Sequence, residues 1–510
     1  MLIPRPATYS PAAGRRVLTA ATTVHAPAEI ADLLRELLSP ATGLPLPDAP
    51  DAELVFGLDG AAADELGDEG YRLTVDGSGV RATAYTLDGL RWAVQALRQL
   101  LPPQICGTQP VSGVEWSLPY ADITDRPRYP WRGVLIDVGR WHQPVSWLRT
   151  VVDLLALHRM NTLHLHLTED QGWRFEVKRY PLLTEVGAWR SESPVGHENI
   201  KQADRTPHGG WYTQDELREL VAYAARRGVT IVPEIDVPGH TTAAIAAYPE
   251  LGDDPAARLA TGTRWGIYRT VLNCDDATVT FCKHVLDEVV DVFPAAYVHL
   301  GGDEVPPGEW AANPVARARM AQLGLTDPED LLGWWITELA DHLRGHGRRV
   351  VVWDELVKRG APADAVIMAW RDETKVAAAL EAGHDVIATP QTHLYLDHYE
   401  SDQPGEPLGI GGHSPLDKVY GYDPEPAEAP DGGNRVVGVQ GNLWGEYLPT
   451  VGRAAYNLLP RLSAVAEAGW GTRSDYPDFR ERLDVMLRRF DALGVAYRRP
   501  EPLDQAGPDA

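Results

Sequence analysis

The 510-residue sequence has few cysteines and no long apolar run. Its three cysteines, Cys106, Cys274 and Cys282, are too few for a disulfide framework, and no metal-type Cys/His spacing surrounds them. Cys274 and Cys282 are the nearest candidates for a pair, and the alternative, which we favour, is three free buried thiols in a reducing compartment. No apolar run approaches the length of a bilayer span, so we expect no membrane partner.

Positive charge is also scarce, with 47 Lys and Arg against 72 Asp and Glu and a formal net charge of −25. Nucleic acids and anionic membranes are bound by clustered Lys and Arg, so neither is expected as a partner. The first residues show no basic segment followed by an apolar one, as a signal peptide has. We therefore expect a cytoplasmic protein.

Phenylalanine is rare, with 6 residues, whereas tryptophan is abundant, with 16. Some of these tryptophans fill the core, but the flat face of Trp also packs on the C–H surface of sugar rings. An apolar fraction of 44% and a charged fraction of 23% are ordinary for a globular protein. The length suits a barrel-sized domain together with a smaller one.

The segment pattern changes near the prolines at residues 127–130. Residues 1–127 mix strand-like and helical segments, which predicts a small α+β domain. In residues 128–495, short apolar strands alternate with amphipathic helices, and residues 496–510 are predicted to form a flexible tail. The eight predicted strands are residues 133–138, 162–167, 229–237, 297–302, 349–355, 365–370, 385–390 and 436–444.

Eight strands joined by crossover helices pair in parallel, which predicts a (β/α)8 TIM barrel for the larger domain. The alternative is an open doubly wound sheet. That fold is disfavoured because no glycine-rich phosphate loop follows the first strand.

Acids and tryptophans recur where these strands end, the edge at which such barrels carry their active sites. A lone Asp there is usually a helix cap, but a ring of carboxylates with three Trp exceeds what capping explains. Carboxylates accept hydrogen bonds from vicinal hydroxyls and Trp packs on pyranose rings, so a carbohydrate ligand is predicted. The residues concerned are Asp137, Arg140, Glu169, Asp170, Glu234, Asp236, His240, Asp303, Glu304, Trp353, Asp354, Glu355, Trp370, Arg371, Tyr395, Asp397, Trp444 and Glu446.

A metal site is an alternative, because His164, His166, His240 and His299 stand among these acids. No H-E-x-x-H motif is present, and the acids are spread over eight strands. We therefore predict neither a metal nor a cofactor.

The stretch HLGGDEV, residues 299–305, sets Asp303 and Glu304 side by side. Retaining glycosidases with two catalytic carboxyls hold them about 5–5.5 Å apart across the anomeric carbon, and inverting enzymes about 6.5–9.5 Å apart. Neighbouring residues at a strand end point to opposite sides, so they rarely frame one bond. The alternative is substrate assistance, in which one acid protonates the leaving oxygen and the other holds a 2-acetamido group that attacks the anomeric carbon.

Eight motifs follow one another along the chain: RGVLIDVGR, NTLHLHLTEDQGWR, PEIDVPGH, HLGGDE, VVVWDE, AWR, YLDHY and LWGE. In these motifs and their order, the chain resembles the β-N-acetylhexosaminidases of glycoside hydrolase family 20, over about residues 10 to 495. This resemblance implies that Glu304 is the general acid and then base, that Asp303 holds the acetamido N–H, and that Tyr395 binds the acetamido oxygen.

The resemblance also implies roles for residues around this centre. Trp353, Trp370 and Trp444 would enclose the acetamido methyl group and the ring, while Arg140, Asp397 and Glu446 would bind the outer hydroxyls. Among supporting residues, His240 would pair with Glu169 or Asp170, and His299 would be a structural hydrogen-bonding residue. The segment after YLDHY lacks the tryptophan that some relatives place there.

The implied activity is exo-acting, retaining hydrolysis of terminal N-acetylglucosamine, with N-acetylgalactosamine as an open alternative. Two other readings remain: a lacto-N-biosidase-like glycosidase of the same fold, and a non-catalytic sugar-binding protein. The second is disfavoured because Asp303, Glu304 and Tyr395 are all present.

Overall fold

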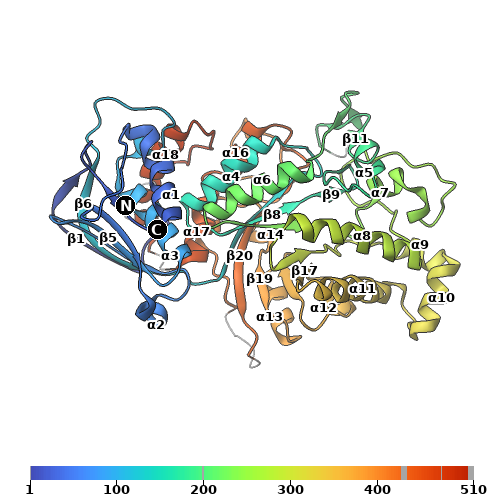
Figure 1. Cartoon of the computed structure of the whole chain (residues 1–510). Helices are drawn as coiled ribbons and strands as arrows, with labels where there is room; N and C mark the ends of the chain where they lie inside the picture. Colours follow the sequence, from blue (N-terminus) through green and yellow to red (C-terminus); the bar gives the residue numbers. More distant parts are fainter. Residues whose placement is uncertain (1, 198–199, 427–432, 472–473, 503–510) are drawn as a thin grey trace, which may run out of the picture.

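The computed structural model describes residues 2–197, 200–426, 433–471 and 474–502, and shows a smaller N-terminal domain beside a barrel (Figure 1). The N-terminal domain is a six-stranded sheet in the order β1-β6-β4-β5-β3-β2, packed against α1 (Ala28–Thr42) and α3 (Leu87–Leu100). Its strands are β1 (Thr8–Val17), β2 (Val24–His25), β3 (Leu54–Leu58), β4 (Tyr71–Asp76), β5 (Gly79–Ala84) and β6 (Ser117–Asp125).

Local sequence explains these elements. In β4, residues alternate between buried and half-buried, as one face of the sheet covers the core and the other is partly solvated. Helix α3 begins after Thr86, whose hydroxyl accepts from the backbone N–H groups of Asp88 and Gly89.

The second domain is a closed barrel of eight parallel strands, in the order β15-β16-β17-β18-β19-β20-β7-β8. The predicted TIM barrel is therefore confirmed, and the open doubly wound sheet is wrong. The strands are β7 (Trp131–Asp137), β8 (Thr162–His166), β15 (Thr230–Glu234), β16 (Tyr297–His299), β17 (Arg349–Trp353), β18 (Val366–Ala369), β19 (Val386–Ala388) and β20 (Val436–Leu443).

Helices surround the barrel, so its strands are buried on both faces, which accounts for their continuous apolar sequence. The helix α6 starts with a capping box, in which Thr213 and Glu216 bind each other's backbone N–H groups. The longer helices are α4 (Val145–Leu157), α6 (Gln214–Arg226), α8 (Asp276–Val292), α10 (Pro314–Leu323), α11 (Leu331–Gly345), α13 (Thr374–Glu381), α16 (Val451–Leu458), α17 (Arg461–Trp470) and α18 (Tyr476–Leu493).

The C-terminal part of the chain joins the two domains. Helix α18 packs against η2 (Pro103–Cys106) of the N-terminal domain, and Trp470 at the end of α17 is part of that domain's apolar core. Residues 496–510 were predicted to be a flexible tail, but Arg498 is buried and ion-paired with Glu400 and Glu406 at 3.4 and 3.0 Å. The tail's first residues are thus packed on the barrel, and residues 503–510 lie outside the described residues.

All three cysteines are buried and unpaired, so the Cys274–Cys282 pair is wrong. Within the described ranges, no helix has both the length and the apolar character that crossing a membrane requires.

Candidate active site

A cavity of about 400 Å³ opens at the carboxyl ends of the barrel strands, a volume within the range of small-molecule sites. All nine residues predicted to be catalytic or substrate-binding line it: Arg140, Asp303, Glu304, Trp353, Trp370, Tyr395, Asp397, Trp444 and Glu446. The four supporting residues, Glu169, Asp170, His240 and His299, are buried and do not line it.

Asp303 and Glu304 lie on a loop, because β16 ends at His299. The backbone of Gly301, Gly302 and Glu304 is left-handed, with φ of 67°, 90° and 50°. This turn brings both carboxylates toward one side, 3.7 and 3.4 Å from Nε2 of His240, so the divergence expected of neighbours at a strand end is wrong. The left-handed Glu304 is a strained position of the kind that clusters at active sites.

The depth of the two carboxylates differs. The side chain of Asp303 is 14% exposed and that of Glu304 is 33% exposed. Asp303 therefore lies at the buried side of the cavity and Glu304 nearer to solvent.

Replacing Gly301 by alanine is expected to abolish most activity and to lower the melting temperature. A Cβ at this position would lie 1.8 Å from Oδ1 of Asp236, in a conformation that L residues rarely adopt. Gly345→Ala, at the end of α11 with open space around its Cβ, is the matched control. Equal melting temperatures and turnover numbers for the two variants would contradict the steric role of Gly301.

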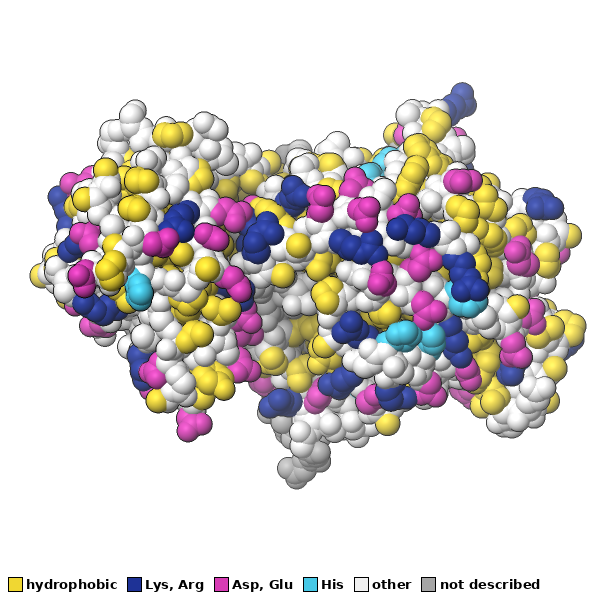
Figure 2. Space-filling view, viewed as in Figure 1, with side chains coloured by type: hydrophobic (Ala, Val, Ile, Leu, Met, Phe, Trp, Pro, Cys, Tyr) yellow, Lys and Arg dark blue, Asp and Glu magenta, His cyan; other side chains and the backbone are white. Residues whose placement is uncertain are grey.

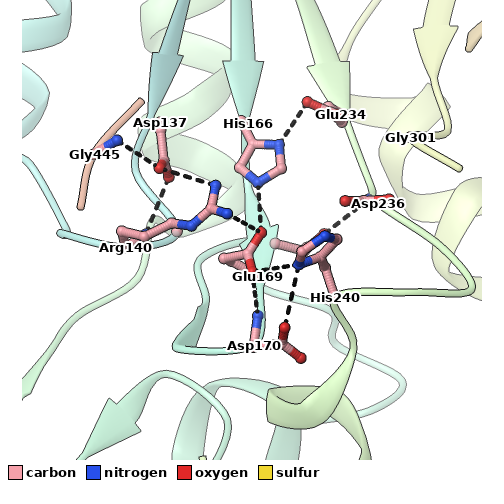
Figure 3. A network of polar contacts seen from close by, with 12 residues as sticks. Asp137, Arg140, His166, Glu169, Asp170, Glu234, Asp236, His240, Gly301 and Gly445 are labelled. Atoms are coloured by element: carbon pink, nitrogen blue, oxygen red, sulfur yellow. Dashed lines mark hydrogen bonds and ion pairs between the residues drawn. The ribbon is translucent and has the colours of Figure 1, made fainter. Parts of the chain in front are cut away.

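Glu169 lies between two cations beneath the cavity (Figure 3). Its carboxylate is 3.2 Å from Nη2 of Arg140 and 2.9 Å from Nδ1 of His240, and Asp170 is 3.2 Å from the same Nδ1. The sequence predicted that His240 pairs with Glu169 or with Asp170, and in the structure both acids contact it. Glu169 and Asp170 come from a short hairpin after β8, formed by β9 (Thr168–Glu169) and β10 (Gly172–Trp173).

These contacts shift the pKa values of the centre. Burial disfavours charge on His240, but the Glu169 and Asp170 carboxylates raise its pKa well above the ordinary value, so the ring is a cation. Burial and the neighbouring charge of Glu304 together raise the pKa of Asp303 to about 6, against the lowering effect of His240.

At the far wall, the cavity holds two carboxylates with unpaired oxygens. Asp397 is 5% exposed, and neither of its side-chain oxygens has a hydrogen-bond partner. Oε2 of Glu446 is likewise unpartnered, and burial raises the pKa of both carboxyl groups. Arg140 lies 3.9 Å from Glu446 and stacks over Trp444. Buried polar atoms left open in this way are typical of a site that a polar ligand completes.

Aromatic rings form the remaining wall. Trp370 stacks on Tyr395 at 6.1 Å with an interplanar angle of 14°, and Trp353 and Trp444 are tilted against each other at 5.9 Å. The Trp353 indole donates to Glu234, and the Trp370 indole to Glu355. The rings are thus held in fixed orientations around the cavity.

Glu234 was counted among the strand-end acids of PEIDVPGH but was given no role in the site. Its carboxylate accepts from the Trp353 indole and lies 2.6–3.0 Å from ring nitrogens of His164, His166 and His299. His164, Glu234 and His299 are close enough to hold a metal ion, but this carboxylate already holds the rings and Trp353 by hydrogen bonds. Alternation of His164 and His166 on one strand face was the available signal for such a buried cluster.

Other lining residues carried no signal in the sequence. Trp265, Ile267 and Ile410 come from loops that no motif surrounds. Gln391 begins the short helix α14 (Gln391–Leu394), and His398 lies within YLDHY but was given no role. Ile410 stands in the segment where the expected tryptophan is missing.

The sequence model of "Glycosyl hydrolase family 20, catalytic domain" matches residues 129–473, and that of "Glycosyl hydrolase family 20, domain 2" matches residues 1–126. The chain belongs to glycosyl hydrolase family 20. This family membership agrees with the resemblance expected from the strand-end motifs.

Relatives support the family assignment over most of the chain. A beta-hexosaminidase of Porphyromonas gingivalis is 38% identical over 94% of this chain, and one of Vibrio furnissii is 36% identical over 80%. The chain spans 60% and 66% of the length of these two proteins. A Vibrio harveyi family 20 exo-β-N-acetylglucosaminidase, solved with N-acetylglucosamine, has a TM-score of 0.86 and 32% identity, covering 98% of this chain and 78% of the other.

Proposed function

We propose that this family 20 protein is an exo-acting, retaining β-N-acetylhexosaminidase that uses the acetamido group of its substrate as the nucleophile. The observation that carries the proposal is the arrangement of Asp303 and Glu304, which line one cavity at different depths. The Vibrio harveyi relative, an exo-β-N-acetylglucosaminidase by name, supports the same class of substrate.

In the proposed reaction, the acetamido group of the terminal sugar lies on the buried side, where Asp303 accepts its N–H and Tyr395 donates to its carbonyl oxygen. That oxygen attacks the anomeric carbon, the glycosidic bond breaks, and Glu304 gives its proton to the leaving oxygen. The Asp303 carboxylate stabilises the positive oxazolinium ion. Glu304 then takes a proton from water, whose oxygen attacks the anomeric carbon from the face that the leaving group vacated. This attack opens the oxazolinium ring and retains the β configuration.

The exo mode of action is inferred from the wall that holds Asp397 and Glu446, because this wall closes the pocket beyond one sugar. Arg140, Asp397 and Glu446 bind the outer hydroxyls of the terminal sugar, which completes the unpaired carboxylate oxygens found there. A lacto-N-biosidase-like enzyme would need room for a second sugar beyond Asp397 and Glu446. Both are buried side chains at that wall, so the one-sugar pocket is favoured.

Three 4-nitrophenyl glycosides test the proposal: the β-N-acetylglucosaminide, the β-N-acetylgalactosaminide and the β-glucoside. We expect turnover of one or both acetamido sugars and none of the glucoside, because the glucoside lacks the nucleophile. A thiazoline mimic of the oxazolinium ion should inhibit competitively. Cleavage of the glucoside at a similar rate, without thiazoline inhibition, would show that the enzyme supplies its own nucleophile.

A further inference from the structure

On the outer surface of the barrel, outside the cavity, two helices share a cluster of three metal-type ligands. Helices α8 and α11 lie next to each other (Figure 1), and Asp287 of α8 faces His342 of α11 and His346 at its end. Oδ1 of Asp287 is 2.7 Å from Nε2 of His342 and 3.1 Å from Nε2 of His346. The three ligand atoms all lie within 4.8 Å of one another.

The spacing of the histidines has a simple cause. Residues four apart on a helix lie on the same face, so His342 and His346 present their rings side by side, with centroids 5.0 Å apart. The neighbouring helix supplies the carboxylate. The side chain of His342 is 23% exposed, that of His346 40% and that of Asp287 43%, so a hydrated ion can reach all three from solvent. Figure 2 shows histidine side chains at the surface over this helix pair.

We propose that Asp287, His342 and His346 form a binding site for a first-row divalent metal ion such as Zn²⁺, with water as the fourth ligand. Zinc binds imidazole nitrogen at about 2.0–2.1 Å and carboxylate oxygen at about 2.0–2.2 Å in tetrahedral geometry, which sets ligand atoms roughly 3.3 Å apart. The Nε2–Oδ1 separations of 2.7 and 3.1 Å need only small side-chain rotations to reach that spacing. Two imidazoles and one carboxylate suit zinc better than magnesium, which prefers oxygen.

The position of the site gives it a structural effect. Helix α8 leads into β16, which precedes the Asp303–Glu304 loop, and α11 leads into β17, which ends in Trp353. The two strands are neighbours in the barrel. One turn away, Lys283 and Glu338 join the same two helices at 2.9 Å. An ion held between α8 and α11 cross-links them at a second point, so it stabilises the folded chain without touching the cavity.

The test uses the full chain without any affinity tag, titrated with ZnCl₂ by calorimetry and followed by thermal unfolding. We expect one Zn²⁺ equivalent whose affinity falls about tenfold or more in His342→Gln and in His346→Gln, which is a loss of about 1.4 kcal/mol or more. His25→Gln, an exposed histidine of the N-terminal domain, is the control and keeps the wild-type affinity. Co²⁺ should give the visible absorption of a tetrahedral ion in the wild type and lose it in both variants.

Zinc should raise the melting temperature of the wild type but not that of the double variant, which carries both His342→Gln and His346→Gln. In metal-free buffer, the wild type and the double variant should turn over substrate at the same rate. The alternative is that the cluster is only a His–Asp ion pair. In that case Zn²⁺ affinity and the Co²⁺ spectrum are unchanged in the variants, and the proposal is overturned. If zinc binds instead to the acids of the cavity, it will inhibit turnover in the double variant as well as in the wild type. If that is the zinc binding that calorimetry detects and the cluster binds none, the proposal is likewise overturned.

Discussion

Glu304→Gln is expected to lower kcat/KM by roughly 10²–10⁴-fold for substrates with a poor leaving group, the usual range for loss of a general acid. An amide keeps the size of the side chain but has no acidic proton for the glycosidic oxygen. For a 2,4-dinitrophenyl glycoside, whose leaving group needs no proton, kcat/KM should stay within about tenfold of the wild type. Turnover itself should remain slow, because the second step needs the same residue as a base.

Azide tests that second step. It attacks the oxazolinium ion without a base, so it should restore turnover of Glu304→Gln on the activated substrate and yield the β-glycosyl azide. Glu309→Gln, in the short helix α9 (Gly308–Ala312) that follows this loop and outside the cavity, is the matched control and should behave as the wild type. An equal loss of kcat/KM for both leaving groups would remove Glu304 from the role of general acid.

The barrel could be predicted because parallel strands buried on both faces have a distinct sequence pattern, and the strand ends indicated where to look for the site. Arg140, Trp353 and Glu446 belong to three separate strand ends, yet all line one cavity. Closure of the barrel brings strand ends together, whatever their distance along the chain.

The loop geometry of Asp303 and Glu304 could not be predicted in the same way. Alternation along a strand was extended past His299, where the strand ends and the left-handed turn begins. The two glycines were the available signal, since glycine pairs mark positive φ. Trp265 and Ile267 were missed for another reason: loop residues reach the cavity through tertiary folding, and no local pattern records that.

Asp303→Asn is expected to lower kcat/KM by roughly 10²–10³-fold for every leaving group, the range for loss of one preorganised electrostatic contact. The amide no longer carries the negative charge that orients the acetamido N–H and stabilises the oxazolinium ion. Neither an activated leaving group nor azide should restore activity. If the variant instead shows the leaving-group dependence of Glu304→Gln, the division of roles between the two residues is wrong.

The same variant should gain stability at neutral pH relative to the wild type. In the folded chain the pKa of Asp303 is raised from 3.8 to about 6, so ionising this carboxyl is harder in the folded chain than in the unfolded one. Above pH 3.8 this difference lowers the free energy of unfolding of the wild type. This loss of stability is absent below pH 3.8, grows as pH rises towards 6, and is fully present above it, at most roughly 3 kcal/mol. Asparagine never ionises and avoids it. Urea unfolding at pH 4.5 and 7.5 should therefore show the stability of Asp303→Asn rising relative to wild type with pH. A pH-independent difference would mean that Asp303 ionises as easily in the folded chain as in the unfolded one.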